Sequence, residues 1–164
     1  MVIDNTISQN ISPQKIWDIL EQIPDPEIPV LSIVDLGIVR KVNIDSNDIT
    51  IEITPTYSGC PAMDMIAAEI RLTLLMNNIR HFNLKTTLFP AWTTDWMTEE
   101  GKRKLSLYGI APPNATGNTI DSPKECPRCH STNTNLLSQF GSTPCKALYQ
   151  CDDCREPFDY FKCH

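Results

Sequence analysis

The chain has 164 residues, of which 41% are hydrophobic and 21% are charged, as is typical of a globular protein with one domain or with one domain and a small module. Its net charge of -6 argues against broad binding to nucleic acid phosphates or to an anionic membrane surface. No apolar run is long enough for a transmembrane helix, and the first residues lack the cationic start and apolar core of a signal peptide. We therefore expect a cytoplasmic protein that binds neither nucleic acid nor membrane.

A helix followed by a β-hairpin is predicted at the start of the chain. Ser12 and Pro13 suit the N-cap and the first helical position, and Pro24 ends the helix that they begin. Apolar and polar residues alternate in part over residues 38–44 and 49–55, with a polar turn between the two segments. This alternation is typical of two strands joined by a turn.

One more strand and two more helices complete the first part of the chain. A helical pattern covers residues 62–78, and residues 84–89 predict a third strand. Thr98, which two glutamates follow, begins a last helix that ends near Gly109. The predicted order, α-β-β-α-β-α, indicates a small α+β sandwich over residues 12–110, with helices over one sheet.

A small module follows this domain. Residues 111–125 are rich in Pro, Asn, Thr and Gly, which predicts a linker. The remaining module, residues 126–164, is too short to bury a sufficient core by itself. We therefore expect a metal ion to stabilise it.

Six of the seven cysteines lie in this C-terminal module. Four of them form two Cys-x-x-Cys pairs, with 21 residues between the pairs: Cys126, Cys129, Cys151 and Cys154. Two such pairs supply the four tetrahedral thiolates that bind zinc or iron, and they predict a closed, structural site in a zinc-ribbon-like module. Cys145, Cys163 and His164 are candidate additional ligands of a cluster, and packing in the core or exposure at the surface is the alternative for them.

Cys60 is the one cysteine of the first domain, and it lies between Gly59 and Pro61 at the predicted start of the 62–78 helix. The partial positive charge at a helix N-terminus favours a thiolate, so Cys60 is a candidate reactive or cluster-binding thiol. The alternative is a small residue that packs under the start of the helix. Candidate supporting carboxylates and hydroxyls come from nearby loops: Asp25, Glu27, Asp35, Thr54 and Thr56.

Residues 12–110 resemble the SufT-type iron–sulfur assembly domain. The matching motifs are Asp25-Pro-Glu-Ile-Pro29, Val34-Asp-Leu-Gly37 and Thr54-Pro-Thr-Tyr-Ser-Gly-Cys-Pro61, and the reactive cysteine of that domain falls on Cys60. Nearly end to end, the chain resembles the D-component family of the bacterial phenylacetyl-CoA epoxidase system. This wider resemblance includes Trp92, the two cysteine pairs and the last segment, residues 156–164.

The resemblance to the D component implies an accessory role in aerobic phenylacetate degradation. The implied partners are the di-iron oxygenase and the iron–sulfur flavin reductase of the epoxidase, and the implied task is to install or repair their metal centres. In agreement, the chain has neither the Glu-x-x-His motif of carboxylate-bridged di-iron sites nor a nucleotide-binding glycine loop. We therefore expect zinc or iron at the four paired cysteines, and a transient iron ion or iron–sulfur cluster at Cys60.

Two other interpretations stay open. In the first, the chain is a thiol enzyme with Cys60 as its nucleophile, and the candidate bases are His81, His130 and His164. In the second, Cys60 has no chemical role and the ribbon makes the chain a pure interaction module. The sequence also leaves open whether the chain forms a homodimer and whether it has catalytic activity of its own.

Overall fold

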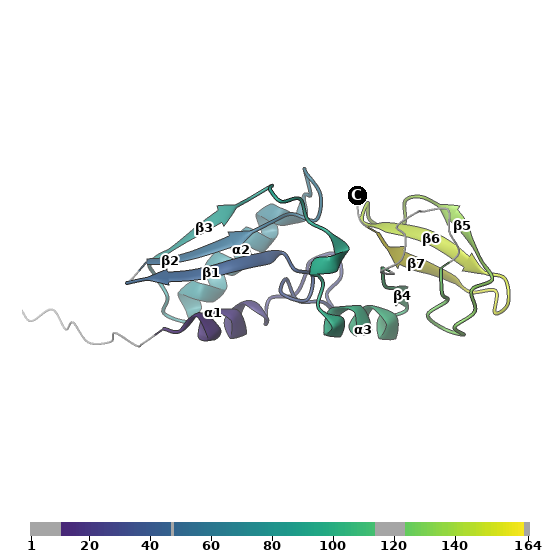
Figure 1. The fold of residues 1–164 in the computed structure, drawn as a ribbon, viewed down its shortest axis with the longest axis horizontal. Helices are drawn as coiled ribbons and strands as arrows, with labels where there is room; N and C mark the ends of the chain where they lie inside the picture. The colour runs from purple at the N-terminus through teal and green to yellow at the C-terminus, as the bar shows by residue number, and fades with distance from the viewer. Residues whose placement is uncertain (1–10, 47, 114–123, 163–164) are drawn as a thin grey trace, which may run out of the picture.

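The computed structural model describes residues 11–46, 48–113 and 124–162, in two parts that lie side by side in Figure 1. The larger part contains α1 (Pro13–Leu20), β1 (Val39–Asp45), β2 (Asp48–Ile53), α2 (Ala62–Met76), β3 (Phe82–Thr86), the short 3-10 helix η1 (Thr94–Trp96) and α3 (Glu99–Tyr108). The smaller part is a sheet of β4 (Ile110–Ala111), β5 (Thr134–Ser138), β6 (Lys146–Cys151) and β7 (Pro157–Phe161). The predicted α+β architecture with a ribbon-like C-terminal module is confirmed.

Side-chain caps fix the starts of two helices where the sequence predicted them. Ser12 caps α1, and its hydroxyl accepts a hydrogen bond from the backbone N–H of Lys15 at 3.2 Å. Thr98 caps α3 in the same way through the N–H of Gly101 at 2.9 Å. Gly109 ends α3 with a φ of 88°, a left-handed conformation that glycine adopts without strain.

The sheet of the larger part has the strand order β1-β2-β3. β1 and β2 form the predicted antiparallel hairpin, and β3 pairs with β2 in parallel. The third strand, predicted over residues 84–89, in fact spans Phe82–Thr86. The pairing stops where β2 stops, at Ile53, whose carbonyl accepts one more hydrogen bond from the N–H of Thr87 at 2.9 Å. Pro90, three residues after Thr87, has no N–H with which to continue the hydrogen bonding between strands.

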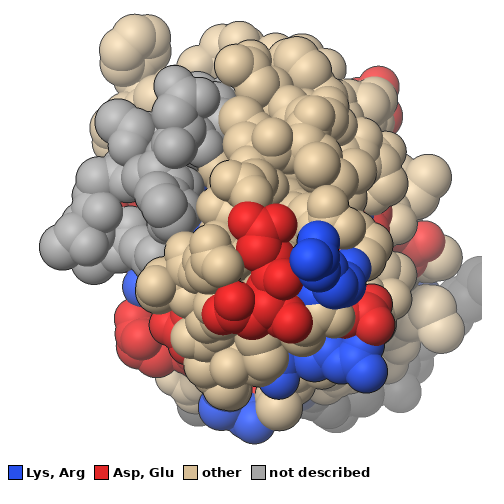
Figure 2. All heavy atoms as spheres, turned by 90° about the vertical axis from the view of Figure 1, so that its right-hand side faces the viewer, with Lys and Arg blue, Asp and Glu red and all other residues tan. Residues whose placement is uncertain are grey.

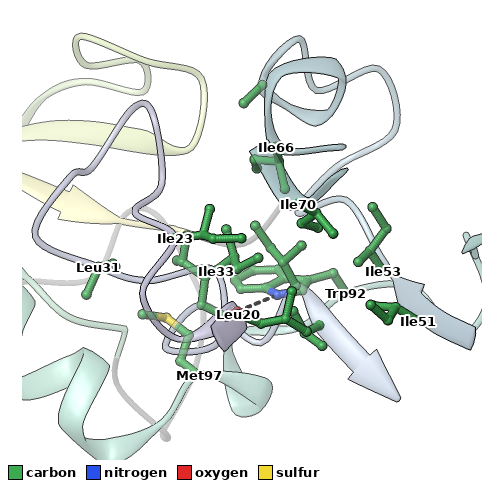
Figure 3. Packing of buried hydrophobic residues seen from close by; sticks show 14 of the residues in the cluster. Leu20, Ile23, Leu31, Ile33, Ile51, Ile53, Ile66, Ile70, Trp92 and Met97 are labelled. Carbon is green, nitrogen blue, oxygen red and sulfur yellow. Dashed lines mark hydrogen bonds between the residues drawn. The ribbon is translucent and has the colours of Figure 1, made fainter. Parts of the chain in front are cut away.

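One apolar core runs through the larger part and reaches into the smaller one. Ile66 and Ile70 of α2 pack into it beside Trp92, whose indole N–H donates to the carbonyl of Leu36 at 2.8 Å (Figure 3). Phe161 of β7 belongs to the same core and meets the Trp92 ring edge-on, with 6.0 Å between the ring centroids. The two parts of the chain are therefore packed against each other.

A strand that the sequence did not predict joins the two parts. β4 follows α3 directly and pairs in parallel with β7, which gives the second sheet the order β4-β7-β6-β5. Ala111, the first residue of the predicted linker, thus belongs to a strand. Residues 114–123 of that linker lie outside the described residues. Lys124 is buried, and its backbone N–H donates to the hydroxyl of Thr134 at 2.9 Å.

The end of the molecule at the right of Figure 1 belongs to the ribbon and carries charges of both signs. Figure 2 views this end, where blue Lys and Arg side chains lie among red Asp and Glu side chains. Arg128 and Glu156 form one ion pair of the ribbon. This mixture differs from the single-sign basic face of a nucleic-acid-binding module. Within the described residues, no helix combines the length and the apolar character needed to cross a bilayer.

Candidate functional site

Four cysteines of the ribbon form a compact cluster of sulfur atoms. The Sγ atoms of Cys126, Cys129, Cys151 and Cys154 all lie within 4.8 Å of one another. The distance between Cys126 and Cys154 is 3.8 Å, and that between Cys129 and Cys151 is 3.5 Å. A tetrahedral ion with metal–sulfur bonds of about 2.3 Å has sulfur–sulfur edges of about 3.8 Å. The donor set and its spacing therefore fit one zinc or iron ion.

Each cysteine pair is followed by a residue with a left-handed backbone. His130 follows the first pair with a φ of 61°, and Arg155 follows the second with a φ of 65°. These turns bring the chain back toward the sulfur atoms, and the N–H of His130 donates to the carbonyl of Cys126 at 2.9 Å. Glycine adopts such a conformation at lower cost, so both residues store strain in the two loops.

Hydrogen bonds between the two loops hold the cysteine pairs together. Asp153 of the second loop accepts hydrogen bonds from the side chains of Ser131 and Asn133, which follow the first pair. Backbone N–H groups of Cys154 and Asp153 lower the pKa of the Cys151 thiol to about 7, which favours its thiolate. The pKa of the Cys129 thiol rises to about 12 despite a hydrogen bond from Ser131, because burial and hydrogen bonds with the other thiols outweigh that bond. An ion that all four thiolates bind would have no open coordination position, which is typical of a structural site.

Cys60 lies in the turn before α2, at the interface between the two parts. The residue is half-buried, and its N–H donates to the carbonyl of Tyr57 at 3.2 Å. Gly59 forms the turn with a φ of 86°. The carbonyl of Cys60 accepts a hydrogen bond from the N–H of Met63, in the first turn of α2, at 3.3 Å. This is the position at a helix start that the sequence indicated.

A cavity of about 10 Å³ lies between Cys60, the loop after α1 and the ribbon. Its lining consists of Asp25, Glu27, Ile28, Leu36, Ile38, Thr56, Cys60, Ile66, Cys145 and Phe161. A cavity of this size holds about one water molecule. It therefore has room for one water molecule or one ion.

Asp25 shapes the loop that carries Glu27 into this cavity. Its Oδ1 accepts hydrogen bonds from the backbone N–H groups of Glu27 and Ile28, at 3.0 Å and 2.7 Å. Burial raises the pKa of Asp25 above its ordinary value, although these hydrogen bonds oppose the change. The prolines on either side stiffen the loop, so the backbone holds Glu27 in place.

Cys145 enters the cavity from the ribbon. It is 4% exposed, and its sulfur lies 3.5 Å from Oε2 of Glu27 and 3.0 Å from the hydroxyl of Thr143. Burial raises the pKa of the Cys145 thiol to about 11, and the charge of Glu27 acts in the same direction. Burial also raises the pKa of Tyr57 to about 12, together with the charges of Cys60 and Glu27 and a hydrogen bond with Cys60. Acidic groups of both parts thus surround one small space.

The structure brings three of the five predicted supporting residues to Cys60, namely Asp25, Glu27 and Thr56. The other two lie elsewhere. Thr54 is buried at the end of β2 and its N–H donates to the carbonyl of Ile38 at 2.9 Å, whereas Asp35 pairs with Lys104 of α3.

Sequence reasoning did not place Cys145 beside Cys60. It named Cys145 as a candidate additional ligand of the ribbon metal, but within the described residues the four-cysteine cluster does not include it. Cys145 follows a proline in the loop before β6, and no spacing pattern relates it to a residue of the first domain. The other two candidates, Cys163 and His164, lie outside the described residues.

Among the described residues that line the cavity, none is a histidine. His81 is exposed just before β3, and His130 contacts Glu125 at 2.8 Å in the ribbon. A Cys–His catalytic pair needs its base within hydrogen-bond distance of the thiol. The arrangement around Cys60 therefore favours a ligand thiol over a nucleophile with a histidine base.

Known protein families match each part of the chain. Residues 13–75 match the family described as iron-sulfur cluster assembly protein, and residues 111–162 match the PaaD zinc beta ribbon domain. A protein of Escherichia coli (strain K12), which is named as the D component of a "Putative 1,2-phenylacetyl-CoA epoxidase", is 53% identical over 151 residues. The match covers 91% of this chain and 92% of that protein.

Shorter relatives match the larger part alone. The Fe-S protein maturation auxiliary factor YitW of Bacillus subtilis (strain 168) is 33% identical over 96 residues, which cover 57% of this chain and 93% of YitW. A solved structure of a domain of unknown function, DUF59, from Bacillus anthracis has a TM-score of 0.54 and 28% identity, and covers 58% of this chain and 92% of its own.

Proposed function

The chain belongs to the D-component family of 1,2-phenylacetyl-CoA epoxidase, and we propose that it is an accessory protein that assists the assembly or repair of iron or iron–sulfur centres in that epoxidase system. Its partners are the di-iron oxygenase and the iron–sulfur flavin reductase, and it acts in the cytoplasm. The names of the shorter relatives support the metal-related task, because three of them are Fe-S protein maturation auxiliary factors.

We assign two tasks to two domains. The domain of residues 12–110 handles the metal at Cys60, and the module of residues 126–164, after a linker over 111–125, docks on the client. One zinc ion at the four paired cysteines stabilises this module. Zinc suits a closed site of four thiolates, and the matching family is described as a zinc ribbon.

The cavity beside Cys60 is the observation that carries the proposal. A thiol and the carboxyl groups of Asp25 and Glu27 line it, and such groups attract a cation. None of the described residues that line it is a histidine, which counts against a thiol enzyme with a histidine base. A half-buried position lets Cys60 meet a partner protein after a small movement.

A Cys60→Ser variant tests this function in a bacterium that grows on phenylacetate. We expect slow growth on phenylacetate, normal growth on succinate, and less iron in the purified oxygenase and reductase. Ser58→Ala is the control, because Ser58 is exposed in the same turn and does not line the cavity.

Normal growth and fully metallated epoxidase in the Cys60→Ser strain would refute a metal-handling role. A Cys126→Ser variant separates this result from the interaction-module interpretation. If Cys126→Ser impairs growth on phenylacetate and Cys60→Ser does not, the ribbon alone accounts for the function.

A further inference from the structure

We propose that Cys60 and Cys145 bind one ferrous ion between them, with Glu27 as a third ligand, so that the ribbon contributes directly to the metal-handling site. This inference rests on the proposed function, and it specifies the cargo and the ligands. The site is distinct from the four-cysteine cluster, which contains none of these three residues.

Three separate segments bring these ligands to one place. The turn before α2 carries Cys60, the loop after α1 carries Glu27, and the loop before β6 carries Cys145. The Cys145 sulfur lies 3.5 Å from Oε2 of Glu27. Tyr57 hydrogen-bonds with Cys60, and Cys60, Glu27 and Cys145 line the same cavity.

Packing between the two domains fixes Cys145 in this position. Its carbonyl accepts a hydrogen bond from the N–H of Lys162 at 2.9 Å, and the residue before Lys162, Phe161, packs on Trp92. A buried cysteine is most often a small apolar residue of a core. Here, however, the sulfur contacts a carboxylate and the hydroxyl of Thr143, which are polar partners.

The cavity contains more acidic groups than cationic ones. Asp25, Glu27, Cys60 and Cys145 line it, and no Lys or Arg does so among the described residues. Lys146, which follows Cys145, is paired with Asp159 at 3.5 Å. The charge of Lys146 also acts on Asp25 and Cys145. A divalent cation would balance the negative charge of Glu27 and of the two thiols once they lose their protons. Two thiolates select ferrous iron or zinc over magnesium or calcium, and the volume of the cavity admits one ion.

Binding involves no change of oxidation state. Two S–H bonds break, two sulfur–iron bonds form, and both protons pass to solvent. The ferrous ion with two thiolates and one carboxylate then carries a net charge of -1.

The site is more open than the ribbon cluster. Among the described residues, only the four ribbon cysteines form a group of three or more possible ligands within 4.8 Å of one another. Metal binding by Cys60, Cys145 and Glu27 therefore requires these three side chains to move closer together. Three protein ligands leave a fourth position for a ligand of the client. A site with three protein ligands binds iron less tightly than a site of four thiolates does. Weaker binding allows the protein to release the iron to its client.

The test uses the reduced full-length protein with zinc in the ribbon, titrated anaerobically with cobalt(II) as a spectroscopic probe and then with ferrous iron. We expect one further ion per chain, with a thiolate-to-metal charge-transfer band. Cys145→Ser should weaken this binding ~10-fold or more and remove roughly half of the band, while the zinc content stays unchanged. Glu27→Gln should weaken binding and keep the band. Glu69→Gln, a change at an exposed carboxylate of α2, is the control and should alter neither.

Two outcomes would overturn the shared site, and they differ in what they say about the proposed function. If Cys145→Ser retains the affinity and the band of the wild type while Cys60→Ser loses both, Cys145 is not a ligand and the role of Cys60 stands. If the wild type binds no ion beyond the zinc of the ribbon, the shared site is refuted. The growth and epoxidase metallation of the Cys60→Ser strain then decide the proposed function independently.

Discussion

Asp35 and Lys104 form an ion pair between the loop after α1 and helix α3, with 2.6 Å between Oδ2 and Nζ. The carboxylate is buried and also accepts hydrogen bonds from the N–H of Ser32 and the hydroxyl of Thr98, both at 3.0 Å. Burial by itself would raise the pKa of Asp35, but the hydrogen bonds from Lys104, Ser32 and Thr98 outweigh burial and lower it. The pair thus anchors α3, the helix that leads into the ribbon.

A Lys104→Met variant should lose about 1–2 kcal/mol of unfolding free energy at neutral pH, because the buried Asp35 carboxylate loses a charged donor. Lys102→Met is the matched control in the same helix. Among the ion pairs of the described residues, Lys102 forms one, with the exposed Glu99 at 2.8 Å. Loss of this exposed ion pair should lower the free energy of unfolding by less than about 0.5 kcal/mol. Urea unfolding of both variants measures the difference, and equal losses would contradict the assignment.

The same comparison has a defined pH dependence. The pKa of Asp35 is lower in the folded state than its unfolded value of about 3.9, so the stabilisation is present above that value and is lost as the pH falls through the folded pKa. The stability difference between the wild type and Lys104→Met should therefore shrink as the pH falls below about 4. A difference that stays constant in acid would show that Asp35 is not the group involved.

Two glycines with left-handed backbones should differ in their tolerance of alanine. At Gly37, with a φ of 68°, an added Cβ would lie 2.3 Å from the carbonyl oxygen of Trp96, whereas at Gly59, with a φ of 86°, it would meet no atom within 4 Å. Gly59→Ala should cost about 1–2 kcal/mol for the backbone alone, and Gly37→Ala should cost about 1–3 kcal/mol more. Chemical denaturation of the two variants provides the comparison, and a Gly37→Ala loss no larger than that of Gly59→Ala would be inconsistent with this packing.

The left-handed residue after the second cysteine pair offers a stabilising change. Arg155 is exposed and has a φ of 65°, so Arg155→Gly should raise the stability of the zinc-loaded protein by up to about 1 kcal/mol. Arg155→Val should lower it, because a β-branched side chain tolerates this conformation poorly. Thermal unfolding of both variants gives the order, and a valine variant as stable as the glycine variant would argue against a strained loop.

Removal of the metal from the four cysteines should disorder the ribbon core. Tyr149 stacks on Phe158 and meets Tyr160 edge-on, so loss of this packing should reduce the near-ultraviolet circular dichroism. Because Phe161 and Cys145 belong to the core of the larger domain, the melting temperature of that domain should fall as well. Chelation followed by zinc addition measures both effects and their recovery. An unchanged aromatic signal after complete metal removal would mean that the ribbon does not depend on its metal.

Local signals in the sequence were sufficient for α1, α2 and α3 and for the four-cysteine site, but they did not predict the short helix η1. Ser12, Thr98 and Gly109 cap helices through contacts with residues close to them in the sequence, so a short segment is enough to predict them. The two Cys-x-x-Cys pairs have the spacing that a tetrahedral metal site requires. The shift of β3 and the presence of β4 depend on partner strands distant in the sequence, so periodicity could not specify them. The meeting of Cys145 with Glu27 depends on how the two domains pack, and no local pattern encodes that contact.

Strand β4 limits how the protein can be divided into fragments. It supplies an edge of the second sheet, where it pairs with β7. A fragment that begins at Cys126 would lack this strand and would expose the hydrogen-bonding edge of β7, a surface that promotes association between identical chains. An isolated ribbon suitable for metal measurements should therefore start before Ile110. Such a fragment keeps β4, the edge strand that directly follows α3.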